Sequence, residues 1–355
     1  MTAGPPDNAA FLEDARAHLA AAREPRTAGP GTDVETLRAA YLGLLKLCLC
    51  DLAGTTTISV GAMPDGTVMS RELRGDARRI RAAGLDWPLE GLTMVGLDRL
   101  DDLQACVESV VADGIAGDLI EAGAWRGGAS ILMRATLDSL GEERTVWVAD
   151  SFQGFPPGEP GEAGVPLSAY DFLAAPLDEV HESFARLGCE RGVRFVPGFF
   201  EETLPALRDE RWAIVRLDAD TYAPTRLALR SLYPRLATGG YLILDDYGSF
   251  AGCRRAVDEF RAEHAIEEPI EKVDSTCVRW RRESAAPIAT APEAAPPAAA
   301  ATGPAPQPRD RHVPTAREVE QARELAALRE RLAAAEAEIG LRAWLRRRLR
   351  RAGAR

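Results

Sequence analysis

The sequence predicts an α/β fold in which a mostly parallel β-sheet is covered by helices on both faces. Two observations predict it. Short apolar stretches alternate with helical stretches between residues 113 and 283, which is the pattern of repeated strand–helix units. The first apolar stretch, 118–122, runs into a glycine-rich turn, and we expect a helix directly after that turn.

The remaining elements follow from hydrophobic period and from glycine positions. We expect helix 223–236 to stop at Gly239-Gly240, because glycine commonly ends a helix. Residues 270–280 alternate like a strand and predict an antiparallel edge hairpin at the C-terminal end of the sheet, whereas 151–175 predict a long loop. The other expected strands are 118–122, 145–149, 193–197, 213–218 and 241–245, and the other expected helices are 127–140, 176–188, 200–208 and 250–264.

The N-terminal third divides into two regions. Residues 1–33 are rich in Ala, Pro and Gly and predict a flexible leader with one short helix over 9–23. Residues 34–112 predict a helical region that forms a lid, with amphipathic helices at 35–53 and 100–113 and irregular chain at 54–90. The cofactor-binding domain is expected over 113–283.

The C-terminal residues predict two further regions. Residues 284–316 are an Ala/Pro-rich linker without apolar periodicity. Residues 317–355 predict a helical tail with two to three heptads of coiled-coil spacing, and 341–355 hold seven Arg and no acid. This basic amphipathic end could contact an anionic membrane surface or an acidic protein, or it could be a solvated tail without a specific role.

Composition excludes several classes of protein. The formal net charge of −11 argues against a nucleic-acid binder. The N-terminus lacks the basic region and apolar run of a signal peptide, and no apolar run reaches the length of a membrane span. The six Cys include no C-x-x-C pair, so we expect reduced, mostly buried thiols in a cytoplasmic protein.

The turn after the first strand indicates the class of cofactor. It reads Asp118-Leu-Ile-Glu121-Ala-Gly123-Ala-Trp125-Arg-Gly127-Gly128-Ala-Ser130. Glycine allows a tight turn and a close approach of backbone to ligand. The spacing is G-x-x-x-G-G and not the G-x-G-x-x-G that binds a pyrophosphate. A cofactor without phosphates fits better, and S-adenosylmethionine is the candidate.

Asp150 ends the next strand, 29 residues after Glu121. A carboxylate at this place could accept both ribose hydroxyls of a nucleoside, as an acidic residue does in dinucleotide-binding folds. The alternative is an ordinary crossover turn with an exposed Asp. The expected cofactor contacts are Glu121, Gly123, Trp125, Gly127, Ser130, Asp150, Ser151 and Phe152.

Two acidic pairs follow the next strands of the sheet. Asp218 and Asp220 follow the strand at 213–218, and Asp245 and Asp246 follow the strand at 241–245. Ligands of open α/β sheets sit outside the carboxyl ends of the strands, and neighbouring carboxylates repel unless a cation lies between them. Oxygen ligands of this kind suit Mg²⁺. The alternative is that these acids cap helices or pair with Arg216, Arg226 or Arg254.

Other functions find less support. Histidine is scarce, and no Ser/His/Asp or Cys/His pattern indicates a hydrolase. A nucleotide-dependent oxidoreductase of Rossmann type is the first alternative, although the glycine spacing argues against it. A non-catalytic scaffold that uses the C-terminal coil is the second, and the acidic pairs argue against it.

With these residues in view, the chain resembles the macrocin O-methyltransferase family over about residues 35–282. Trp125-Arg-Gly-Gly and Asp150-Ser-Phe-Gln-Gly-Phe-Pro156 are specific to this group. The other matching stretches are Tyr41-Leu-Gly-Leu-Leu-Lys46, Gly84-Leu-Asp-Trp-Pro88, Thr93–Gln104, Asp113–Ala129 and the two acidic strand ends.

The resemblance implies a class I methyltransferase sheet and an enzyme that methylates a sugar hydroxyl of a natural product. It implies S-adenosylmethionine and Mg²⁺ as cofactors, with Asp218, Asp245 and Asp246 as metal ligands. Asp220 could replace one of these ligands or act as base, which makes Asp218 and Asp220 the expected catalytic residues. We also expect a small glycoside or saccharide acceptor, a homo-oligomer and no nucleic-acid partner.

Overall fold

The computed structural model describes residues 8–22, 33–62, 68–156 and 167–285. The chain divides into two compact units, Met1–Ala294 and Ala295–Arg355. The second unit lies wholly outside the described residues, as do the predicted linker from residue 286 onward, the coiled-coil heptads and the basic tail.

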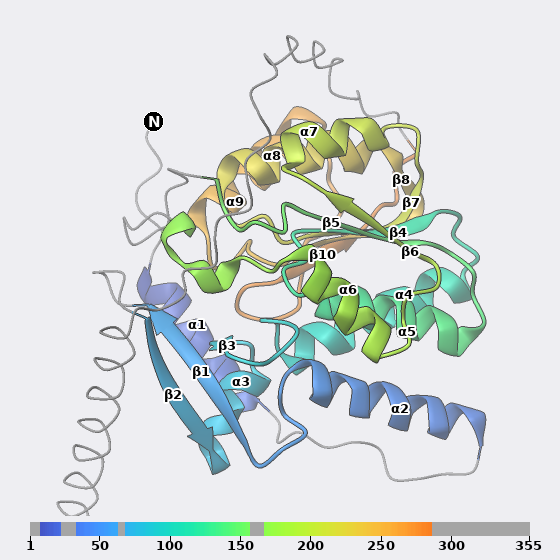
Figure 1. The fold of residues 1–355 in the computed structure, drawn as a ribbon. Helices are drawn as coiled ribbons and strands as arrows, with labels where there is room; N and C mark the ends of the chain where they lie inside the picture. Colours follow the sequence, from blue (N-terminus) through green and yellow to red (C-terminus); the bar gives the residue numbers. More distant parts are fainter. Residues whose placement is uncertain (1–7, 23–32, 63–67, 157–166, 286–355) are drawn as a thin grey trace, which may run out of the picture. The chain divides into compact units, whose positions relative to one another are not determined.

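A seven-stranded sheet forms the centre of this unit (Figure 1). Its order is β6-β5-β4-β7-β8-β10-β9, with parallel pairing from β6 to β8 and antiparallel pairing of β10 with β8 and β9. The predicted α/β class and the antiparallel edge hairpin are therefore confirmed. The strands are β4 (Asp118–Ala122), β5 (Val146–Asp150), β6 (Val193–Pro197), β7 (Trp212–Leu217), β8 (Leu236–Leu244), β9 (Glu271–Lys272) and β10 (Val278–Arg281).

Helices cover both faces of the sheet. Successive strand residues point to opposite sides, so both faces of an apolar strand need to be buried. In β4, Leu119 joins one apolar cluster and Ile120 joins the other. The first cluster includes residues of α2 (Val34–Leu49), α4 (Leu97–Ala112), α5 (Gly128–Leu140) and α6 (Leu177–Arg186). The second cluster lies under α7 (Phe200–Thr203), α8 (Tyr222–Leu232) and α9 (Ala251–Glu263), on the other face (Figure 1). The 3₁₀ turns are Gly75–Arg78, Leu167–Ala169, Asp171–Leu173, Leu204–Leu207 and Tyr233–Arg235.

A second, three-stranded sheet occupies the stretch that we expected to be irregular. It has the order β2-β1-β3, and the short helix α3 (Arg79–Ala82) lies between β2 and β3 in the chain. The strands are β1 (Thr56–Ala62), β2 (Val68–Arg74) and β3 (Trp87–Pro88). The prediction for 54–90 was wrong because polar and charged residues interrupt the apolar pattern of these strands.

The prediction that Gly239-Gly240 ends a helix was also wrong. Helix α8 ends at Leu232, before Pro234, and β8 runs through both glycines. A Cβ at Gly240 would lie 2.6 Å from the Ala213 carbonyl oxygen, so glycine is needed for close strand contact and not for a helix end.

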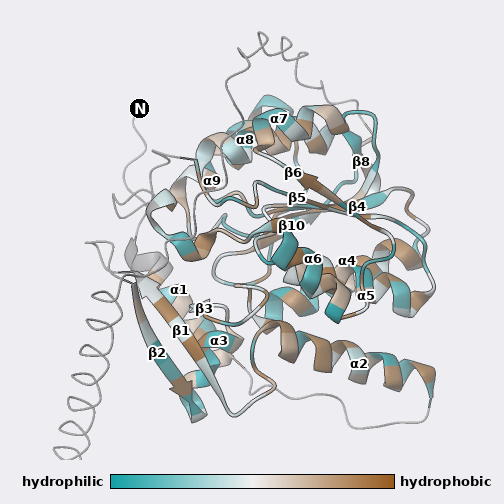
Figure 2. Cartoon of the chain, in the orientation of Figure 1, coloured by the Kyte–Doolittle hydropathy of each residue, from teal (hydrophilic) through white to brown (hydrophobic). Residues whose placement is uncertain are grey.

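Two helices precede the small sheet. Helix α1 (Asn8–Ala21) confirms the short helix expected in the leader. Helix α2 buries Leu42, Leu45 and Leu49, while Val34, Leu37, Tyr41 and Leu44 are exposed at intervals of three and four residues. In Figure 2, hydrophobic and hydrophilic colouring alternate along α2. Among the described helices, none combines the length and apolar character that a membrane span requires.

Candidate active site

The glycine turn is packed directly against the neighbouring strand end. Gly123 has φ +90°, and a Cβ there would lie 1.8 Å from the Asp218 carbonyl oxygen. Gly127 is left-handed at the start of α5, and a Cβ there would meet the Phe184 ring at 2.6 Å. Each glycine therefore serves both a backbone conformation and a close approach. The turn brings β4 and β7 together at the carboxyl edge of the sheet.

Asp150 holds this turn by accepting hydrogen bonds from the backbone. Its Oδ2 accepts from the Ala124 and Trp125 N–H groups, both at 2.9 Å, and its Oδ1 accepts from the Phe152 N–H at 2.8 Å. Burial raises the pKa of Asp150, and these N–H groups oppose that rise. Asp150 thus holds the shape of the glycine turn.

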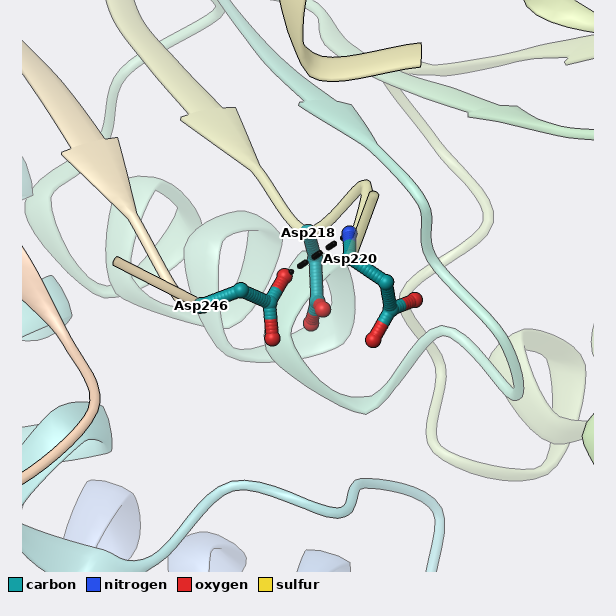
Figure 3. Close-up of side chains that lie close together, drawn as sticks. All are labelled: Asp218, Asp220 and Asp246. Carbon is teal, nitrogen blue, oxygen red and sulfur yellow. Dashed lines mark hydrogen bonds between the residues drawn. The ribbon is translucent and has the colours of Figure 1, made fainter. Parts of the chain in front are cut away.

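Three carboxylates, those of Asp218, Asp220 and Asp246, meet at the ends of β7 and β8 and form what we call the acidic group. Oxygens of Asp218, Asp220 and Asp246 lie within 4.8 Å of one another, close enough to hold one metal ion (Figure 3). The Asp220 N–H donates to Asp246 Oδ2 at 3.0 Å, and Asp220 adopts the left-handed φ of +52°. This hydrogen bond fixes the strand ends so that all three side chains converge.

Asp245 lies outside this group of three. Arg216 Nη2 donates to Asp245 Oδ1 at 2.5 Å, and Arg99 Nη1 donates to Asp245 Oδ2. Both carboxylate oxygens are thus engaged by buried guanidinium groups, as the arginine-pairing alternative anticipated for Arg216. Asp220, and not Asp245, therefore completes the convergent group with Asp218 and Asp246.

Glu121 belongs to the same buried network. Arg216 Nη1 contacts Glu121 Oε1 at 2.6 Å and Asp218 Oδ2 at 3.0 Å, and Ser130 Oγ donates to Glu121. Burial raises the pKa of Glu121 to about 7, although the Arg216 charge and the Ser130 hydroxyl oppose the rise. Glu121, at the end of β4 before the glycine turn, is therefore connected to Asp218 through one arginine.

The acidic group carries strongly perturbed carboxyls. Burial and the negative charge of Asp245 raise the pKa of Asp218 to about 6, against the lowering effect of Arg216. Burial and the charges of Asp220, Asp218 and Asp245 raise the pKa of Asp246 well above its usual value. Without a cation, the protein resists full ionisation of this group.

One cavity of about 790 Å³ connects the glycine turn with the acidic group. Most of the expected residues line it: Glu121, Gly123, Trp125, Asp150, Ser151, Asp218, Asp220, Asp245 and Asp246. Of the described residues that we expected at the site, three lie behind its wall. Gly127 packs on Phe184, Ser130 supports Glu121, and Phe152 is buried near Phe195 with ring centroids 6.3 Å apart.

Sequence reasoning missed Arg99 and Ala15, both of which line the cavity. Arg99 lies on α4, and its Nε is 2.9 Å from Asp274 Oδ2. No local pattern marks either residue, because each reaches the site from an element distant in sequence.

Comparison with known proteins decides the family. The model of the macrocin-O-methyltransferase (TylF) family matches residues 56–282. The chain belongs to this family. It is accordingly an O-methyltransferase, and the oxidoreductase and scaffold alternatives are not favoured.

The similarity to known proteins covers most of this methyltransferase. The 8-demethyl-8-(2,3-dimethoxy-alpha-L-rhamnosyl)-tetracenomycin-C 4'-O-methyltransferase of Streptomyces olivaceus is 44% identical over 263 residues, which cover 71% of this chain and 95% of that protein. The mycinamicin III 3''-O-methyltransferase of Micromonospora griseorubida is 40% identical over 262 residues, 71% and 98% of the two chains. The structure of the O-methyltransferase NovP is similar with a TM-score of 0.62 and 37% identity, covering 70% of this chain and all of that one.

Proposed function

We propose that this methyltransferase transfers a methyl group from S-adenosylmethionine to a sugar hydroxyl of a glycoside, with Mg²⁺ held by Asp218, Asp220 and Asp246. The observation that carries the proposal is one cavity that joins the glycine turn to three convergent carboxylates. The names of two relatives support the acceptor class, because each describes methylation of a glycosylated natural product at a sugar position.

The donor set fits a hard divalent cation. All three side chains offer carboxylate oxygens within 4.8 Å of one another. Burial and the neighbouring carboxylates raise the pKa values of Asp218 and Asp246, and a bound cation would oppose that rise. When bound, the cation would lower the pKa of an acceptor hydroxyl and fix its orientation.

The residues of the chain supply the remaining requirements. The turn at Gly123 and the hydrogen bonds of Asp150 would present backbone to the cofactor, with Ser151 beside it. Asp220 lines the cavity, and the carboxylate oxygen that it does not give to the cation would accept the proton of the acceptor hydroxyl. Arg216 holds one oxygen of Asp218 and thereby orients the other. Holding donor and acceptor in line supplies much of the rate.

Assays with the full chain would test this function. The test acceptors are mycinamicin III and demethyldecarbamoylnovobiocin, the compounds for which two relatives, 40% and 43% identical to this chain, are named. Protein freed of metal by EDTA should lose methyl transfer to them, and Mg²⁺ should restore it. Ca²⁺ should restore it poorly because its bonds are longer and its geometry looser. Full turnover in EDTA would refute the cation's role and leave the methyltransferase assignment standing. Failure with all glycosides, while S-adenosylhomocysteine still raises the melting temperature, would refute the acceptor class.

We further propose that the protein self-associates and that it is cytoplasmic. Self-association would be checked by light scattering coupled to size exclusion, and the exposed apolar residues of α2 are the first surface to test. A cytoplasmic location would be checked by cell fractionation.

A further inference from the structure

Helix α1 reaches the cavity from outside the part of the chain that the family model matches. The match covers residues 56–282, whereas α1 spans Asn8–Ala21. Ala15 nevertheless lines the cavity together with Val60 of β1 and Leu73 of β2. The leader therefore supplies part of the wall of the site.

Two polar anchors hold α1 in this position. His18 Nε2 lies 3.2 Å from Asp98 Oδ2, and its Nδ1 lies 3.4 Å from Ser275 Oγ, while its side chain is only 8% exposed. Four residues earlier, Asp14 Oδ2 pairs with Lys272 Nζ at 2.5 Å. One helical turn separates Asp14 from His18, so both anchors lie on the same side of α1.

The anchors connect α1 to the cavity floor. Asp274 Oδ2 is 3.9 Å from His18 Nδ1 and 2.9 Å from Arg99 Nε, and Arg99 in turn binds Asp245. Asp274 Oδ1 also accepts the N–H of Thr276, which lines the cavity. The loop between β9 and β10 thus contacts α1 through Ser275 and lines the cavity through Thr276.

The order of the sheet assigns α1 to one end of the cavity. Along β5-β4-β7-β8-β10, Asp150 lies at the end of β5, the acidic group at the ends of β7 and β8, and Thr276 just before β10. Thr276 and the anchored α1 therefore lie on the opposite side of the acidic group from Asp150, where the cofactor turn lies.

We infer that α1 walls the acceptor end of the cavity and, through Ala15, limits the size of the glycoside that can reach the acidic group. This inference rests on the proposed function. It makes the N-terminal leader a determinant of acceptor choice, with His18 as a positioning residue that holds the wall in place.

The decisive comparison is between two substitutions on the same helix. Ala15→Trp adds a large ring toward the cavity, whereas Ala17→Trp adds it at an exposed position. We expect Ala15→Trp to raise KM for mycinamicin III and demethyldecarbamoylnovobiocin about tenfold or more, and KM for methyl α-L-rhamnopyranoside much less. The Kd of S-adenosylhomocysteine should stay within about twofold, and Ala17→Trp should change neither quantity.

Hydrogen exchange of α1 provides a readout independent of turnover. In the wild type, the amides of α1 should be protected, and His18→Ala should speed their exchange about tenfold or more while leaving that of α5 unchanged. His18→Ala should also relax the discrimination between large and small acceptors, which a purely structural role elsewhere would not do.

Several results would overturn the inference. They are an unprotected α1 in the wild type, equal KM values in the two Trp variants with α1 still protected, or a weakened cofactor Kd in Ala15→Trp alone. If the wild type methylates none of the glycosides, the proposed function fails, and the exchange measurement alone then decides whether α1 encloses the cavity.

Discussion

Replacing Asp246 by Asn should have opposite effects on the metal-free and the metal-bound protein. The carboxylate oxygens of Asp218, Asp220 and Asp246 lie within 4.8 Å of one another. At that separation and an effective dielectric constant of about 20, each pair of full charges repels by about 3 kcal/mol. The raised pKa of Asp246 shows that protonation already relieves part of this repulsion, so the variant should recover about 1–2 kcal/mol.

Asn preserves the local structure because its carbonyl oxygen can still accept the Asp220 N–H. In EDTA, we therefore expect Asp246→Asn to melt about 3–6 °C above the wild type. Mg²⁺ should raise the melting temperature of the wild type, since a ligand bound only by the folded state stabilises it by about 2.7 kcal/mol at 100 times its Kd. The variant should lose most of that Mg²⁺-dependent rise.

Differential scanning calorimetry with EDTA and with Mg²⁺ would measure both effects, and Asp209→Asn, at an exposed acid, is the matched control. A variant that is less stable than the wild type in EDTA would contradict the repulsion argument. A wild type whose melting temperature ignores Mg²⁺ would contradict the cation site itself.

Three further predictions address the turn, its anchor and the acidic group. Gly123→Ala should destabilise the fold by about 2 kcal/mol or more and abolish cofactor binding, because its Cβ would strike the Asp218 carbonyl oxygen. The control is Gly141→Ala, since Gly141 has φ +75° and nothing within 4 Å of a Cβ; calorimetry should show only backbone strain of about 1 kcal/mol. Asp150→Asn should weaken S-adenosylhomocysteine binding about tenfold or more by calorimetric titration, since an amide cannot accept all three N–H groups; an unchanged Kd would refute its role in the turn. In EDTA, the free energy of unfolding should fall as pH rises from about 4 to about 6, because the folded state holds a proton on Asp218 (pKa about 6) that the unfolded state has released. The stabilisation by Mg²⁺ should grow over the same pH range, because the metal competes with that proton. A Mg²⁺ effect that is independent of pH would exclude this linkage.

The sequence predicted the parallel core well because each strand is a short apolar run that ends in a glycine or an acid. Strands β4 and β6 have the expected bounds, 118–122 and 193–197. The small sheet was missed because β1 and β2 are rich in polar and charged residues, and their pairing with each other, not an apolar run, makes them strands. Helix α8 was predicted too long because Pro234 was given less weight than the glycine pair that follows it.

The sequence could not predict which three of the four Asp residues converge. Spacing along the chain places Asp218, Asp220, Asp245 and Asp246 at two neighbouring strand ends, and that much was predicted. Which three converge depends on the turn after β7, where Asp220 takes a left-handed conformation and donates its N–H to Asp246.

The pairing of Asp245 with arginine, in place of membership in the acidic group, depends on a residue that no local sequence pattern reveals. Arg99 comes from α4, 146 residues earlier in the chain, and with Arg216 it occupies both Asp245 oxygens. Removing either arginine would leave a buried carboxylate partly unpaired beside the acidic group, which is more destabilising than losing the pair as a whole. Asp245 therefore lies paired between two arginines, and through Arg216 it helps to orient Asp218, so its contribution to the site is indirect although it lies next to Asp246 in the chain.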